Sequence, residues 1–480
     1  MFWRGVIGYL PVNIVQGVVG LLTIVVFTRL LSPAQYGVYA LAFSVMSLAH
    51  TVIFTWLESA MARFYAAEAK GEQLADHFAT LYRAWTSLAF GFPVVSGLIL
   101  WRWPMPATLK IAVGAGLAAI LVRSLLKLAQ ERRRASGDVS GAALIDIVQT
   151  AGGFAVGAGL AAGWGGASPL IGLGAAAAVC LIWALPTELR ARKGGQFEAA
   201  RARLYAAYGL PISLSLILSL VLATTDRFVL AAYWNETSVG VYQAGYSLAN
   251  RTLDVMFIWL GMAGGPASVA ALELGGLDAL RTTARQQASF MISLTLPAAV
   301  GLALVARPLA EVMVGPRLRD GAAQVTPWIA ASAFLAGITV YYFHTAFTLG
   351  RRTHLLMAVM ALPAILNLVL NLALTPPLGV TGALWATLIS YGVGASASWG
   401  VGRRVLPLPM PWTTLAKASA ASAVMALAVC LIPSVGGVIE LLTKAAVGGL
   451  IYGGCALAFD LGDLRRRGLQ LARVLQAKIA

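Results

Sequence analysis

The chain has 480 residues, of which 59% are hydrophobic and 11% are charged, and its formal net charge is +16. Ordinary soluble domains contain about 25% charged residues, so this composition excludes a soluble globular protein and indicates a polytopic membrane protein. A positive net charge is also typical of nucleic-acid binding, but here the basic residues are distributed between apolar segments, so we exclude nucleic acid as a partner.

About fourteen apolar segments are long enough to cross a bilayer, because a hydrocarbon core of about 30 Å requires roughly 20 apolar residues per helix. The sequence begins MFWRGVIGYL and runs into the first segment without an Ala-x-Ala cleavage site, so we expect an uncleaved first helix. Segments five and six are rich in Gly and Ala, which predicts close backbone packing. The segments cover residues 5–28, 36–62, 79–102, 106–128, 139–163, 167–189, 206–233, 238–265, 286–314, 325–349, 353–376, 380–402, 413–433 and 437–459.

The basic residues are distributed unequally between the two sides of these segments. With the N-terminus inside, most of the 35 Lys and Arg residues lie in inner loops, for example in 132–134 and 465–467. This bias follows the positive-inside rule and predicts that both termini are cytoplasmic. Two interpretations stay open for residues 460–480, where leucines alternate with arginines: a basic amphipathic helix on the inner leaflet, or a solvated cytoplasmic tail.

One stretch of sequence occurs twice. Residues 37–57 (GVYALAFSVMSLAHTVIFTWL) and 240–260 (GVYQAGYSLANRTLDVMFIWL) align without a gap, and an arginine precedes each, Arg29 and Arg227. Such a repeat predicts two related lobes. Because each lobe has six spans, an even number, we expect a near-twofold axis along the membrane normal. The predicted parts are the N-terminal lobe 1–190, a cytoplasmic linker 191–204, the C-terminal lobe 205–404, two extra helices in 405–459, and the cytoplasmic tail 460–480.

The eighth span contains a stripe of polar residues. Gln243, Ser247, Asn250, Arg251 and Asp254 have spacings that place them on one side of a helix. Arg251 lies about 20 Å along the helix from the start of the span, near the bilayer midplane. A charge there costs about 2.5 to 3.5 kcal/mol, so it should face a cavity or a partner. Two interpretations stay open: Arg251 and Asp254 neutralise each other between helices, or they handle substrate or ions.

Weaker polar faces occur in other spans. The second span carries Ser and Thr at the repeat positions of this stripe, and Glu58 continues that face toward the cytoplasm. Asn13 and Gln16 share one face of the first span. An aspartate gains nothing from positive-inside sorting, so Asp146 in the fifth span is expected to serve in an ion pair or in function.

The remaining motif classes are not supported by the sequence. Cys180, Cys430 and Cys455 lie far apart in apolar stretches, and the four histidines have no metal-ligand spacing, so we expect no metal site. No G-x-x-x-x-G-K-[ST] motif occurs, which argues against an ATPase domain and a nucleotide cofactor. The outer loops are short and carry few charges, so they leave little room for a catalytic site. We therefore expect no cofactor and no enzymatic activity.

Three segments resemble the polysaccharide transport family, the Wzx-like flippases of lipid-linked oligosaccharides. Residues 28–41 (TRLLSPAQYGVYAL) resemble its signature after the first helix, and 225–230 (TDRFVL) with 240–242 (GVY) resemble the repeat of that signature. Residues 367–387 (NLVLNLALTPPLGVTGALWAT) resemble its pattern N-x-x-L-x-P-x-x-G-x-x-G-A-x-x-A-T, with one extra residue before the glycine. The resemblance spans nearly all of residues 1–402, and the last two helices match its fourteen-helix members.

The resemblance implies the fold of the multidrug/oligosaccharidyl-lipid/polysaccharide superfamily, in which two six-helix lobes form a V around a cationic cavity that opens alternately to each side of the bacterial inner membrane. The implied substrate is an undecaprenyl diphosphate-linked oligosaccharide, moved from the cytoplasmic to the periplasmic leaflet. Proteins of polysaccharide polymerisation and export are candidate partners. Arginines suit phosphate oxygens. The candidates for substrate binding are Arg29, Arg227, Arg251, Asn13, Gln16 and Asn250, and those for ion coupling are Asp254, Asp226, Asp146 and Glu58.

Two alternative functions stay open. One is an exporter of the related multidrug and toxin extrusion family, whose cavity relies on carboxylates and aromatics for cations, whereas this chain places arginine beside aspartate within its spans. The other is a non-transporting scaffold of an envelope polysaccharide synthesis complex. A neighbouring cluster of glycosyltransferase genes would favour the flippase.

Overall fold

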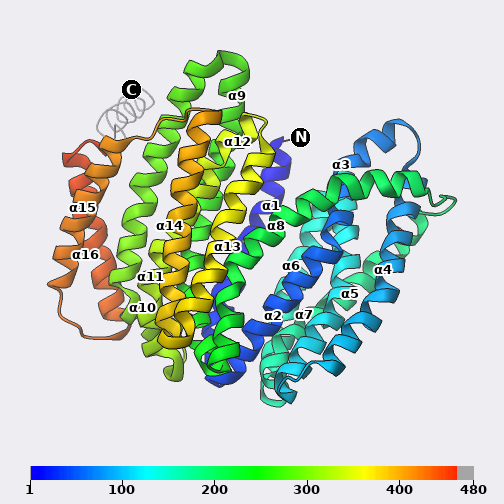
Figure 1. Cartoon of the computed structure of the whole chain (residues 1–480), viewed down its shortest axis with the longest axis horizontal. Coiled ribbons are helices and arrows are strands. Elements are labelled where there is room, and N and C mark those ends of the chain that lie inside the picture. Colours follow the sequence, from blue (N-terminus) through cyan, green and yellow to red (C-terminus); the bar gives the residue numbers. More distant parts are fainter. Residues whose placement is uncertain (1, 462–480) are drawn as a thin grey trace, which may run out of the picture. The chain divides into compact units, whose positions relative to one another are not determined.

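The computed structural model describes residues 2–461, with side chains from residue 11 onward, and its regular structure is helical (Figure 1). No strand occurs among these residues, so the predicted all-helical class is confirmed. By its internal contacts the chain divides into two compact units, Met1–Gly240 and Val241–Ala480. The part of the predicted tail from residue 462 onward lies outside the described residues.

The first unit contains the helices of the first six predicted spans and the whole of the seventh. The second predicted span is divided at Phe54, a turn residue with φ of −115° that separates α2 from α3. Gly165, with φ of 47°, makes the turn between the fifth and sixth spans through a short 3-10 helix. The helices are α1 (Phe2–Leu30), α2 (Pro33–Ile53), α3 (Thr55–Lys70), α4 (Leu74–Arg102), α5 (Ala107–Ala135), α6 (Val139–Trp164), η1 (Gly165–Ala167), α7 (Ser168–Ala191), α8 (Ala199–Tyr233) and the first residues of α9 (Glu236–Leu304).

The second unit begins within α9 and ends with a helical hairpin. α9 contains the eighth predicted span and most of the ninth, whose remainder lies in α10. α9 turns at Gly276, whose φ of 68° lies in the left-handed region that favours glycine. Gly379, with φ of 59°, makes the turn between α13 and α14. The remaining elements are α10 (Ala306–Met313), η2 (Pro316–Leu318), α11 (Arg319–Ile338), the π-helix η3 (Thr339–Phe343), α12 (Thr345–Leu349), α13 (Thr353–Leu378), α14 (Val380–Val405), α15 (Trp412–Cys430) and α16 (Gly437–Ala458).

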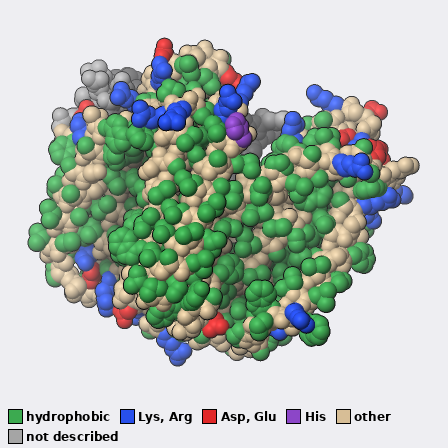
Figure 2. Space-filling view, viewed as in Figure 1, with side chains coloured by type: hydrophobic (Ala, Val, Ile, Leu, Met, Phe, Trp, Pro, Cys, Tyr) green, Lys and Arg blue, Asp and Glu red, His purple; other side chains and the backbone are tan. Residues whose placement is uncertain are grey.

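Within residues 2–461, 11 helical segments are long and apolar enough to cross a membrane. Two of these, 139–191 and 236–304, are long enough for two passes each, and α14 has the length of a further pass. The total agrees with the predicted number of about fourteen. Figure 2 shows hydrophobic side chains along the sides of the helices and basic side chains near the helix ends, the distribution that a bilayer requires.

Small residues allow the predicted close packing of the fifth and sixth spans. A Cβ atom on Gly172 of α7 would lie 2.3 Å from the carbonyl oxygen of Gly153 and 2.5 Å from the nitrogen of Gly157, both on α6. No real side-chain carbon tolerates such distances, so the two backbones can touch only because these positions lack side chains. Gly172 is therefore a packing residue.

The first glycines of the two repeat copies lie against each other. Ser32 caps α2 in a capping box with Gln35, which fixes where the helix begins. A Cβ on Gly37 would lie 1.8 Å from the carbonyl oxygen of Glu236, and one on Gly240 would lie 2.1 Å from that of Pro33. The repeat thus has glycine at two positions where the starts of α2 and α9 leave no room for a side chain.

The segment that follows α7 is held against α4. The backbone N–H of Gln196 donates to Asp76 Oδ1 (2.6 Å), and a Cβ on Gly195 would lie 2.0 Å from the carbonyl oxygen of Ala75. Further along, Arg201 donates to Gln73 Oε1 (2.6 Å). These contacts explain why α8 clusters with the first unit, although the sequence repeat assigns it to the C-terminal lobe. The lobe boundaries drawn from the repeat stay a prediction.

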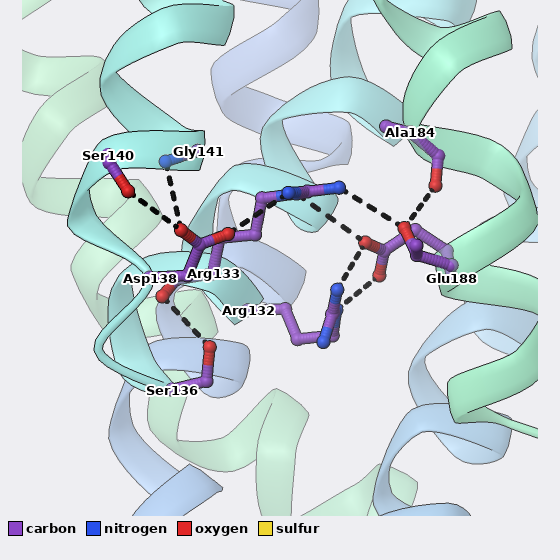
Figure 3. A network of polar contacts seen from close by, with 9 residues as sticks. Arg132, Arg133, Ser136, Asp138, Ser140, Gly141, Ala184 and Glu188 are labelled. Carbon is purple, nitrogen blue, oxygen red and sulfur yellow. Dashed lines mark hydrogen bonds and ion pairs between the residues drawn. The ribbon is translucent and has the colours of Figure 1, made fainter.

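Three consecutive arginines at the end of α5 are bound to carboxylates of α7, of α6 and of the residue that caps α6, and Figure 3 shows two of them, Arg132 and Arg133. Arg132 donates to both oxygens of Glu188, at 2.5 and 2.7 Å. The hydroxyl of Tyr82 also donates to Glu188 (2.6 Å). Arg133 donates to Asp138 Oδ2 (3.0 Å). Arg134 forms an ion pair with Asp146 of α6 (2.7 Å). The run predicted to mark the cytoplasmic side thus also fastens three helices together.

Asp138 caps α6, since its Oδ1 accepts the backbone N–H of Gly141 (2.9 Å). Burial raises the pKa of the Asp138 carboxyl, but the hydrogen bonds from Gly141 and Arg133 outweigh it and hold that pKa below its ordinary value. A lowered pKa in the folded state stabilises the protein above the unfolded pKa, and this contribution is lost as the pH falls through the folded value.

We expect Glu188→Ala to lower the free energy of unfolding by about 3 to 5 kcal/mol, because it leaves two guanidinium groups beside an empty buried position. Denaturant-induced unfolding of the purified protein in detergent measures this change. Glu273→Ala is the matched control, since Glu273 is exposed near the turn of α9, and its effect should stay within about 0.5 kcal/mol. Equal stability of the two variants would refute the structural role of Glu188.

Candidate functional site

The polar stripe of the eighth span lies on α9, where two hydrogen bonds join its side chains in pairs. Gln243 Nε2 donates to Ser247 Oγ (2.8 Å), and Asn250 Nδ2 donates to Asp254 Oδ2. Both pairs are four residues apart, which is the spacing of neighbours on one side of a helix. Ser247 is buried, while Asn250 and Asp254 are half-buried. The stripe therefore combines amide and hydroxyl groups with one carboxylate inside a membrane span.

Arg251 does not use this carboxylate as an ion-pair partner. Its side chain is exposed and forms no hydrogen bond or ion pair with any residue in 11–461, although it lies within electrostatic range of Asp254. Asp254 accepts its hydrogen bond from Asn250 instead. Direct pairing of Arg251 with Asp254, one of the two interpretations left open by the sequence, is not what this structure contains. A guanidinium in a membrane span is costly without a partner, so Arg251 is suited to an anion that comes from outside the chain.

Arg29 and Arg227, the arginines that precede the repeat copies, make the same local contact. Arg29 Nη1 donates to the carbonyl oxygen of Val25 (2.7 Å), and Arg227 Nη1 donates to that of Ala223 (2.8 Å). Arg29 is exposed near the end of α1, whereas Arg227 and its neighbour Asp226 are buried in α8. Of these two arginines, Arg29 is the more accessible to a ligand.

Of the other polar candidates, some are exposed and some are already bound to neighbouring side chains. Asn13 and Gln16 are exposed on α1. Asp146 is buried on α6, where it accepts hydrogen bonds from Gln130 (3.0 Å) and Arg134 (2.7 Å). Its charge is thus neutralised within the first unit by a neighbouring helix, which corresponds to the ion-pair interpretation, and we do not include it in the proposed function.

Glu58 lies in the first turn of α3 and contacts a residue that the sequence did not single out. Its Oε1 is 2.8 Å from His50 Nε2, and His50 is in the last turn of α2. Arg123 of α5 lies within electrostatic range of the same carboxylate. The sequence offered two signals for this cluster: a histidine eight residues before the glutamate, and an arginine deep inside a span.

The fold is similar to that of known flippases and drug transporters. The structure titled "Lipid II flippase MurJ, inward closed conformation" superposes with a TM-score of 0.75 and 14% identity, covering 94% of this chain and 98% of that one. An inward-facing multidrug resistance MATE family transporter of the MOP superfamily gives a TM-score of 0.66 and 14% identity, with 83% and 97% covered. A MOP superfamily transporter from Pyrococcus furiosus gives 0.55 and 13%, with 83% and 92% covered. These likenesses confirm the predicted fold of the superfamily.

Sequence comparison identifies the family. No curated protein matches the chain in sequence. The sequence profile of the family described as "Polysaccharide biosynthesis protein" matches residues 26–320. That match covers more than half of the chain, including both copies of the repeat and the stripe of α9. The chain therefore belongs to this polysaccharide biosynthesis family, as its motifs predicted.

Proposed function

We propose that the protein translocates an undecaprenyl diphosphate-linked oligosaccharide from the cytoplasmic to the periplasmic leaflet of a bacterial inner membrane by alternating access. Membership of a polysaccharide biosynthesis family and a fold similar to a lipid II flippase support a transporter of lipid-linked glycans. The observation that carries the proposal is Arg251, an exposed guanidinium within a membrane span that lacks an ion-pair partner among residues 11–461.

The chemistry of the substrate fits this residue. A diphosphate carries negative charge that hydrocarbon does not solvate, so moving it across a bilayer requires cations along its route. A guanidinium presents a planar set of donors that matches phosphate oxygens in pairs. Arg251 and Arg29 are our main candidates for this contact, with Asn250, Asn13 and Gln16 available to hydroxyl groups of the glycan. Arg227 would contribute if α8 moves during transport.

A drug exporter is the second candidate, because the fold is also similar to MATE transporters. A site for organic cations would need accessible carboxylates. In this chain Asp254 is bound by Asn250, and the exposed charge of the stripe is an arginine. These features favour an anionic substrate, and they give no reason to expect catalysis at this stripe. The excess of basic residues in the predicted inner loops favours cytoplasmic termini.

Deletion of the gene tests the proposed function. We expect the deletion strain to accumulate undecaprenyl-linked oligosaccharide on the cytoplasmic leaflet, where it is protected from a glycosidase added to spheroplasts. A copy of the gene should restore access of the glycosidase to the glycan. If no lipid-linked sugar accumulates and the strain becomes sensitive to cationic drugs, the exporter is supported instead. If the sugar accumulates but is fully accessible, the protein acts after translocation, as a scaffold would.

Arg251→Ala should reduce export of the lipid-linked glycan at least tenfold, because a charge-assisted hydrogen bond of about 1.5 to 3 kcal/mol is lost. Arg251→Lys should restore export only partly, since an ammonium keeps the charge but not the planar fork. The matched control is Arg281→Ala, which removes an exposed arginine of α9 that is paired with Asp278 near the Gly276 turn. Normal export by an inserted Arg251→Ala protein would refute the assignment.

Asp254 is our candidate for ion coupling in the same stripe. Asp254→Asn keeps the volume of the side chain but removes its charge, so we expect slower export and a flatter dependence of the export rate on pH. Export measured in inverted vesicles at several pH values tests this. An unchanged pH profile would show that Asp254 does not couple ions and only accepts the hydrogen bond from Asn250. The coupling ion would then have to act elsewhere in the chain.

A further inference from the structure

A second charged cluster inside a membrane span lies in the first unit, where α2 ends and α3 begins. His50 Nε2 and Glu58 Oε1 are 2.8 Å apart across the break at Phe54, and their side chains are 22% and 16% exposed. Residues eight apart in a straight helix are separated by about 12 Å along its axis, so this ion pair closes a distance of two turns. A positive charge at the end of α2 and a carboxylate at the start of α3 would each be favoured by the helix dipoles.

The contact between His50 and Glu58 leaves the carboxylate of Glu58 able to accept further hydrogen bonds. The two atoms are close enough for an ion pair, but their alignment is not that of a hydrogen bond, and the buried Oε1 of Glu58 accepts no hydrogen bond from residues 11–461. A carboxylate offers about four lone-pair positions. A second donor could therefore bind Glu58 without a large rearrangement.

Arg123 of α5 is a candidate for that second donor. It lies within electrostatic range of Glu58, and its Nη1 is 4.0 Å from the sulfur of Met46. It forms no ion pair with a carboxylate in 11–461, although it lies about 24 Å along α5 from the first residue of the helix. Two basic side chains, His50 and Arg123, thus share one acidic neighbour, and of these two only His50 contacts it.

We propose that Arg123 binds a phosphate group of the transported lipid, and that protonation of His50 controls whether Arg123 is available to do so. This inference rests on the proposed function and adds a binding residue and a coupling mechanism to it. When His50 carries a proton, it holds Glu58, and Arg123 is free to bind the anion. When His50 loses that proton, Glu58 turns to Arg123 and displaces the phosphate. One proton is bound when the phosphate binds and is released when it leaves.

The other charged groups around His50 do not take the place of Glu58 or Arg123 in this mechanism. α5 adds Lys127 and Glu131, one and two turns beyond Arg123, and Glu131 accepts a hydrogen bond from Arg134 in an ion pair (2.5 Å). On α2 itself, Tyr39 lies within electrostatic range of Arg123. α8, which also packs on α3, brings the backbone of Gly209 against Trp56. Glu58 therefore remains the acidic group that both His50 and Arg123 can reach.

The test is binding of undecaprenyl diphosphate to the full-length protein in nanodiscs of zwitterionic lipid, at pH 5.5 and pH 8. Because the proposal makes binding depend on a protonated histidine, the wild type should bind the lipid at least about tenfold more tightly at the lower pH. The phosphates also change charge in this range, and His50→Gln provides the matched control for that effect. We expect His50→Gln to lose the pH dependence that comes from the protein and to bind weakly at both values.

Two further variants separate the roles of the carboxylate and the arginine. Glu58→Gln should bind tightly at both pH values, because the competitor of the phosphate has been removed. Arg123→Gln should bind at least about tenfold more weakly at pH 5.5, while Arg123→Lys should recover part of that loss. Inorganic pyrophosphate should compete with the lipid in the wild type and much less in Arg123→Gln. The unfolding midpoint of each variant, measured in the same nanodiscs, identifies any loss of binding that comes from misfolding.

The outcomes distinguish this inference from the proposed function. If the wild type binds the lipid but Arg123→Gln, folded normally, binds it equally well, Arg123 is not a phosphate ligand and the inference fails while the flippase proposal stands. The coupling part is overturned if His50→Gln keeps the full pH dependence of the wild type. If the wild type binds neither the lipid nor pyrophosphate, and deletion of the gene leaves lipid-linked sugars unchanged, the proposed function itself is wrong.

Discussion

The cost of placing a charge in hydrocarbon is the constraint on which the rest of this structure depends. An ionised side chain inside a membrane span must be paired within the protein, reach water, or wait for a charged ligand. In the first unit most buried charges are paired: Arg132 with Glu188, Arg133 with Asp138, and Arg134 with Asp146. Because such pairs contribute little once desolvation is counted, their main effect is to fix how α5, α6 and α7 pack. Charges without this kind of pairing are the ones that can act on a substrate.

Much of the fold could be predicted from the sequence, because hydropathy reports directly on membrane helices. Segment length gave the number of passes, and the Gly and Ala content of the fifth and sixth spans indicated the close contact now seen at Gly172. The break of the second span at Phe54 could not be predicted, since no proline or glycine marks it and the same phenylalanine recurs in the second repeat copy at Phe257, inside a continuous helix. A break of this kind depends on tertiary packing, about which hydropathy carries no information.

The candidate site was only partly predictable for a related reason. Spacing within one helix identified the stripe from Gln243 to Asp254, because residues four apart must be neighbours. Spacing says nothing about which charges meet between helices. The sequence therefore left open whether Asp146 and Arg251 are paired, whereas in the structure the first is held by Arg134 and the second has no ion-pair partner in residues 11–461. The relation of Arg123 to Glu58 could not be predicted for the same reason, since it depends on how α3 packs on α5.

The two repeat copies share a scaffold but not their chemistry. In the alignment that pairs Gly37 with Gly240, His50 corresponds to Leu253 and Glu58 to Gly261, whereas Arg251 and Asp254 correspond to Leu48 and Thr51. Each copy thus carries one set of charges, at positions where the other copy has uncharged residues. A duplicated helix that kept identical charges would offer the same group twice to an asymmetric lipid. Different charges fit the two proposals: Arg251 in one copy is a permanently cationic binding residue, and His50 in the other controls through its proton whether Arg123 of α5 is available. Such a division of roles would allow binding and release to be controlled separately within one fold.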